Sequence, residues 1–86
     1  MSKGRILVVE DDPSTLLGLE EKLRMEDYEV SSAADGEAAR EKLADEAFDL
    51  MILDLMLPKL DGLSVLRWVR KRPSALPVLI LSAKGR

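Results

Sequence analysis

The 86-residue sequence contains no cysteine and no histidine. Without cysteine the chain can form neither disulfide bonds nor a thiolate metal site, and without histidine it lacks the commonest general base and transition-metal ligand. Any chemistry must therefore come from carboxylates, hydroxyls, lysines and the backbone. The chain also has no excess of basic residues, because 16 acidic residues outnumber 13 basic ones and give a net charge of −3. This balance argues against general nucleic-acid binding, which requires a basic face.

Long apolar runs are missing as well. No run approaches the length needed to cross a bilayer, and the segment Met1 to Arg5 lacks the long apolar stretch of a signal peptide. We therefore expect a cytoplasmic protein that makes no membrane contact. With 47% hydrophobic and 34% charged residues, the composition is typical of one small globular domain rather than a disordered tail.

Three short aliphatic runs, each followed by a polar residue, predict strands. They are residues 6–9, 50–53 and 78–81. Continuous apolar runs of this length suit strands that are covered on both faces, as in a parallel sheet. Residues 28–31 alternate between apolar and polar side chains instead, which predicts a half-exposed edge strand.

Segments with helical periodicity lie between these strands. Asp12 can cap a first helix with Pro13 in its first turn, and Asp35 is expected to cap a second helix. Asp61 is expected to cap a third, which ends before Pro73. The alternation of strands and helices, with right-handed crossovers, predicts an α/β fold with helices on both faces of a parallel sheet. The side chains expected to face the sheet are Leu16, Leu19 and Leu23, then Ala39, Leu43 and Ala47, then Val65, Leu66 and Val69, whereas Trp68 is expected to be partly exposed.

Polar residues end several of the strands, and a parallel sheet brings them to one edge. Glu10 and Asp11 follow the first run, Asp54 follows residues 50–53, and Ser82 follows the last run. In a flavodoxin-like strand order, 2-1-3-4, the strands ending in Asp11 and Asp54 are neighbours, and adjacent strands lie about 4.8 Å apart. Carboxylates crowded in this way repel one another without a cation, and an all-oxygen ligand set favours Mg2+.

The motifs around these residues closely resemble the receiver domains of two-component signalling. The similar segments are residues 6–12 (ILVVEDD), residues 53–58 (LDLMLP) with Asp61-Gly62, and residues 81–84 (LSAK). Their order and spacing match the family over essentially the whole chain. The resemblance therefore implies the receiver fold and a role in accepting phosphoryl groups.

The resemblance also assigns a role to each polar residue at this edge. By it, Asp54 is the phosphoacceptor and a Mg2+ ligand, Asp11 is a second ligand, and Met56 is a third through its backbone carbonyl. Glu10 acts mainly through metal-bound water, and Ser82 is the switch hydroxyl that moves toward the phosphoryl group. The phosphoryl donor is a histidine of a sensor kinase. Such a domain catalyses its own phosphorylation but turns over no separate substrate, so we expect no enzyme.

The chain is shorter than the family pattern. A complete receiver continues through a fourth helix, a fifth strand and a fifth helix, so residues 1–86 are expected to form a receiver domain without this C-terminal part. The fifth-strand lysine, which pairs with the aspartate and its phosphoryl group, is missing with it. One face of the third and fourth strands is then expected to be bare, with residues 78–81 as an exposed edge. We therefore expect a homodimer or swapped oligomer, or a fragment of a longer protein.

Two other functions compete with this interpretation. Phosphatases of the haloacid-dehalogenase type also use magnesium and an aspartyl phosphate, but they carry a second aspartate two residues after the nucleophile, where this chain has Met56. The other alternative is a truncated, non-phosphorylated interaction or dimerisation module that keeps the receiver fold. Phosphoryl transfer to Asp54 separates this second alternative from the leading interpretation.

Overall fold

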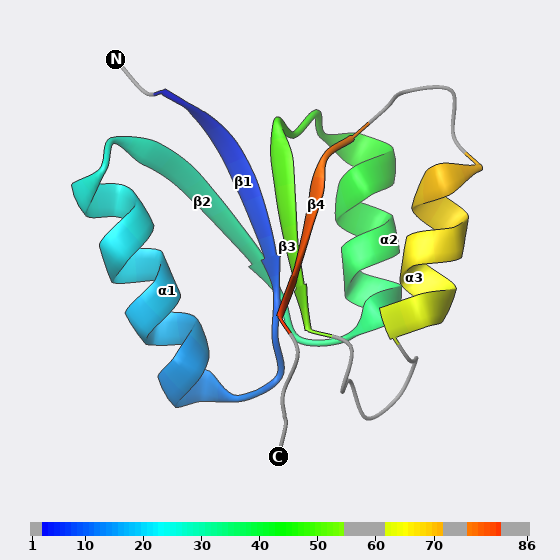
Figure 1. Cartoon of the computed structure of the whole chain (residues 1–86), viewed down its shortest axis with the longest axis horizontal. Coiled ribbons are helices and arrows are strands. Elements are labelled where there is room, and N and C mark those ends of the chain that lie inside the picture. Colours follow the sequence, from blue (N-terminus) through cyan, green and yellow to red (C-terminus); the bar gives the residue numbers. More distant parts are fainter. Residues whose placement is uncertain (1–2, 55–61, 72–75, 82–86) are drawn as a thin grey trace.

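The computed structural model describes residues 3–54, 62–71 and 76–81, which form a single sheet with helices on both sides (Figure 1). All the strand pairs in these residues are parallel, and the strands lie in the order β2-β1-β3-β4. The predicted flavodoxin-like order is therefore confirmed, with α1 on one face of the sheet and α2 and α3 on the other. The elements are β1 (Gly4–Val9), α1 (Pro13–Met25), β2 (Tyr28–Ala33), α2 (Gly36–Asp45), β3 (Leu50–Asp54), α3 (Gly62–Arg70) and β4 (Val78–Leu81).

Aspartates cap the first two helices, as the sequence predicts. The carboxylate of Asp12 accepts the backbone N–H of Thr15, and Pro13 is the first residue of α1. The carboxylate of Asp35 accepts the backbone N–H of Ala38 in the first turn of α2. Each cap satisfies an N–H group that has no partner within its helix. Asp61, the predicted cap of the third helix, lies outside the described residues.

The larger hydrophobic core lies between the sheet and the pair α2 and α3. It contains Leu7 and Val9 of β1 and Met51 and Leu53 of β3, all with no measurable exposure. These residues alternate along their strands, so they share the face that α2 and α3 cover. The helix side chains buried there are Ala39, Leu43, Val65 and Val69, with Leu66 and the half-buried Trp68 packed against them.

One inward position that the sequence predicts for the second helix is wrong. Ala47 is exposed, because α2 ends at Asp45 and Glu46 already has extended backbone angles of φ −134° and ψ 154°. The chain turns there to enter β3. The helix that carries Ala39 and Leu43 on its inward face therefore ends two residues before Ala47.

A smaller core lies between the opposite face of the sheet and α1. Ile6, Val8 and Ile52 are buried in it. The predicted inward face of α1 packs against them through Leu16, Leu19 and Leu23, which are half-buried. None of the helices in the described residues is both long enough and apolar enough to cross a membrane.

The expectation of a bare face holds for the last strand of the sheet but not for the third. Ile52 of β3 is only 4% exposed, because it lies in the smaller core beneath α1. Its partner in β4, Leu79, is 52% exposed, and Ile80 is 36% exposed. Within the sheet of the described residues, the large apolar side chains left exposed therefore lie on the edge strand β4.

Candidate functional site

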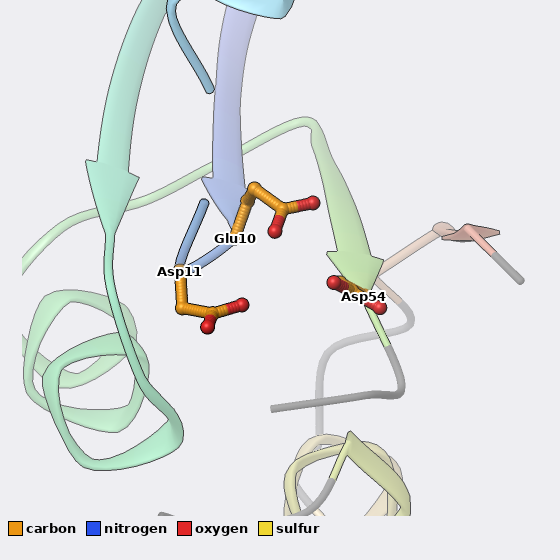
Figure 2. Close-up of side chains that lie close together, drawn as sticks. All are labelled: Glu10, Asp11 and Asp54. Atoms are coloured by element: carbon orange, nitrogen blue, oxygen red, sulfur yellow. The ribbon is translucent and has the colours of Figure 1, made fainter. Parts of the chain in front are cut away.

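Three acidic residues meet where β1 and β3 end at the same edge of the sheet. The two strands are adjacent and parallel, with Val9 paired to Leu53. Glu10 and Asp54 directly follow this pair, and Asp11 follows Glu10. Figure 2 shows their carboxyl groups gathered around one small space. One carboxylate oxygen from each residue lies within 4.8 Å of those of the other two. The sequence therefore predicted this convergence correctly.

Burial divides the three acids into two kinds. Glu10 and Asp54 are 5% and 8% exposed, whereas Asp11 is exposed. Burial raises the pKa of Glu10 above its usual value, and the nearby carboxylates of Asp54 and Asp11, together with a side-chain hydrogen bond to Asp54, raise it further. The backbone N–H of Asp12 opposes this effect by donating to the carboxylate. Glu10 therefore favours a proton, or a cation close by, over a free negative charge.

Hydrogen bonds fix the backbone at Glu10 and at Asp12, the two residues that flank Asp11 in the chain. The N–H of Glu10 donates to the carbonyl of Ala33 at the end of β2, over 3.0 Å. The N–H of Asp12 donates to Oε2 of Glu10, also over 3.0 Å. Asp12 itself is held by α1, because the backbone N–H and the hydroxyl of Thr15 both donate to its Oδ2. The sequence indicated Asp12 as a helix cap but gave no sign of its bond to Glu10.

The chemistry of the donor set fits a hard divalent cation. The chain holds no histidine or cysteine, so carboxylates and other oxygens are the donors available. Mg2+ prefers oxygen ligands and commonly binds through one or two carboxylates while keeping several waters. Asp11 is exposed, so its carboxylate is accessible to solvent. Glu10, Asp11 and Asp54 could therefore hold Mg2+, with the ion replacing the proton that their mutual repulsion favours.

Two residues that the sequence assigned to this site, Met56 and Ser82, lie outside the described residues. Their predicted roles, as a carbonyl ligand and a switch hydroxyl, therefore stay predictions. Leu81, the residue before Ser82, pairs with Asp54 across β3 and β4.

The sequence pattern of the family described as "Response regulator receiver domain" matches residues 6–86 of the chain. The chain belongs to this family. Receivers of two-component response regulators take part in phosphoryl transfer from a kinase and bind Mg2+ through acidic residues, and they are generally not enzymes with a separate substrate. The acidic cluster described above lies in the matched residues.

Two transcriptional regulators illustrate how this receiver relates to longer proteins. It is 44% identical over 80 residues to the alkaline phosphatase synthesis transcriptional regulatory protein PhoP of Bacillus subtilis, a match that covers 93% of this chain and 33% of PhoP. It is also 44% identical over 81 residues to the transcriptional activator protein PfeR of Pseudomonas aeruginosa. This match covers 94% of this chain and 26% of PfeR. The receiver therefore spans about a third or less of these relatives.

Solved structures show the same arrangement of the chain. The response regulator protein TrrA of Thermotoga maritima, solved in complex with Mg2+-BeF, is 38% identical with a TM-score of 0.90. The match covers 99% of this receiver and 72% of that chain. A structure of the histidine kinase ThkA in complex with TrrA matches with 37% identity and a TM-score of 0.88, covering 100% of this receiver and 72% of that chain.

Proposed function

We propose that this receiver accepts a phosphoryl group on Asp54 from a histidine of a sensor kinase, with Mg2+ bound by the carboxylate cluster. The observation that carries the proposal is the meeting of Glu10, Asp11 and Asp54 from adjacent strands, with an oxygen of each within 4.8 Å of the others. The complexes of TrrA with Mg2+-BeF and with a histidine kinase support the same ion and the same class of partner. We place the protein in the cytoplasm, where such a kinase would present its phosphohistidine.

The proposed reaction transfers the phosphoryl group between two protein side chains. A carboxylate oxygen of Asp54 forms a bond to phosphorus while the bond from phosphorus to the histidine nitrogen breaks, and that nitrogen keeps the electron pair. Bound Mg2+ would offset the negative charge on the phosphoryl oxygens. In our proposal Asp11, Asp54 and the carbonyl of Met56 are direct ligands, Glu10 acts through water, and the hydroxyl of Ser82 moves toward the phosphoryl group.

The decisive experiment is intact-mass spectrometry after incubation with Mg2+ and a small phosphoryl donor such as acetyl phosphate. We expect the parent to gain one phosphoryl group and Asp54→Asn to gain none. Asp45→Asn is a matched control, because Asp45 is an exposed aspartate at the end of α2, outside the cluster. A folded parent that gains no phosphoryl group would contradict the proposal, as would equal gains in the parent and in Asp54→Asn.

The exposed strand β4 favours a second candidate, a module that associates without phosphorylation. β4 is the last strand in the sheet order, and Leu79 and Ile80 are 52% and 36% exposed on it. Uncovered apolar edge strands promote pairing between chains. We propose that the 86-residue chain forms homodimers or swapped oligomers through this strand.

Sedimentation velocity over a range of concentrations tests this association. We expect Leu79→Lys to shift the chain toward monomer, because the lysine places a charge on the edge strand. Leu17→Lys is the matched control, since Leu17 is 55% exposed but lies on α1. A parent that sediments as a monomer at every concentration would exclude the association.

A further inference from the structure

The cap of α1 is joined to the acidic cluster through a single residue, Asp12. Its carboxylate Oδ2 accepts the backbone N–H of Thr15 over 3.0 Å and the Thr15 hydroxyl over 2.6 Å. Its carbonyl accepts the N–H of Leu16 over 2.9 Å. Its own N–H donates to Oε2 of Glu10 over 3.0 Å. Asp12 therefore uses three of its polar groups to connect the first turn of α1 with a carboxylate of the cluster.

This connection determines where Asp11 can lie. The side chain of Asp11 is exposed, so packing against a core does not hold it in place. Its backbone instead runs between Glu10, which is anchored to Ala33 of β2, and Asp12, which is anchored to α1. Because both neighbours are anchored, the backbone of Asp11 is fixed even though its side chain faces solvent.

We infer that Asp12 is a positioning residue for the metal site, which it serves through its helix cap rather than through its charge. The inference rests on the proposed function, since it assumes that the cluster binds Mg2+. Loss of the cap would free the backbone at Asp12, withdraw the N–H from the carboxylate of Glu10, and let Asp11 move. Groups that orient metal ligands without touching the metal typically change metal affinity by about ten- to a hundredfold when they are removed.

The chain offers a matched control for the loss of a cap. Asp35 caps α2 in the same way, with its carboxylate accepting the N–H of Ala38 over 2.8 Å and its carbonyl accepting the N–H of Ala39 over 3.1 Å. It follows β2, which carries none of the three clustered carboxylates. Asp12→Ala and Asp35→Ala should therefore destabilise the fold similarly but differ in their effect on metal binding.

Titration calorimetry with Mg2+ alone, on the parent and three variants, tests the inference. We expect the dissociation constant to rise about tenfold in Asp12→Ala and to stay near the parent value in Asp35→Ala. Asp12→Asn keeps a good cap but removes the charge, so it should bind Mg2+ within about threefold of the parent. Equal affinities in Asp12→Ala and the parent would overturn the inference. So would an Asp12→Asn variant as weak as Asp12→Ala, because charge would then be the cause.

Amide hydrogen exchange provides a readout that needs no metal. The N–H of residue 12 should exchange faster in Asp12→Ala than in Asp12→Asn, because the alanine variant no longer holds that N–H against Glu10. Equal exchange rates at this position would overturn the inference. A parent that binds no Mg2+ would contradict the proposed function instead, and the exchange comparison would still decide the role of Asp12.

Discussion

Replacing Asp54 by asparagine should stabilise the metal-free protein while abolishing its response to Mg2+. The reason is the repulsion between buried carboxylates whose oxygens lie within 4.8 Å of one another. Two full charges at this separation repel by about 1 kcal/mol at the dielectric constant of water and by about 3.5 kcal/mol at an effective value of about 20. Because 4.8 Å is the largest separation of these oxygens and Glu10 and Asp54 are only 5% and 8% exposed, the second value is the more appropriate of the two. We expect Asp54→Asn to raise the free energy of unfolding by about 1–3 kcal/mol at mildly alkaline pH.

The sign of the pH dependence follows from the raised pKa of Glu10, which is caused first by burial and then by Asp54. Glu10 contributes fully to the free energy of unfolding at pH values below the ordinary pKa of a glutamate. This contribution is lost as the pH rises through the raised pKa that Glu10 has in the folded state. As the pH falls, Glu10 takes up a proton and its repulsion with Asp54 disappears. The advantage of Asp54→Asn should therefore shrink as the pH falls.

Urea denaturation followed by the fluorescence of Trp68, the only tryptophan, measures this effect at mildly acidic and mildly alkaline pH. Mg2+ at ten times its dissociation constant should stabilise the parent by about 1.4 kcal/mol and Asp54→Asn far less. Asp45→Asn controls for the loss of one negative charge outside the cluster. An Asp54→Asn protein no more stable than the parent at alkaline pH without Mg2+ would refute the reasoning.

Two further predictions concern the site and the core. Mg2+ affinity should fall as the pH drops through the raised pKa of Glu10, because the ion then competes with a proton on this residue. Calorimetry in buffers of different ionisation enthalpy should show proton release on binding. Binding without proton release would contradict this competition. Leu7→Ala should lower the free energy of unfolding by about 3 kcal/mol, because Leu7 lies in the core with no exposure. Met25 is 81% exposed, so Met25→Ala should change this free energy by less than about 0.5 kcal/mol in the same urea assay.

The sequence predicted the sheet well because its strands carry strong, unambiguous patterns. Residues 6–9 and 50–53 are aliphatic runs that only a doubly covered strand can bury, and both belong to the central strands β1 and β3. The site followed from the same patterns, since Glu10 and Asp54 directly end these runs. Parallel strands with a known order leave little freedom for where such residues can meet.

Other features depended on information that a sequence pattern does not carry. The end of α2 before Ala47 was missed because the segment Asp45-Glu46 contains neither glycine nor proline to mark a stop. The cover over Ile52 depends on how far α1 reaches across the sheet. The bond from the N–H of Asp12 to Glu10 requires one particular side-chain conformation of Glu10, which spacing cannot reveal.

The central place of β1 has a consequence for the order in which the chain folds. β1 precedes β2, β3 and β4 in the chain, yet it pairs on one side with β2 and on the other with β3, for example through Ile6 with Val30 and with Leu50. Contacts between distant parts of a chain form late, because a longer loop must close. We expect pairing with β2 to come first and the acidic cluster to assemble only when β3 joins. Nascent chains that end before Leu50 should therefore lack Mg2+-dependent protection from proteolysis, and chains that include Asp54 should gain it.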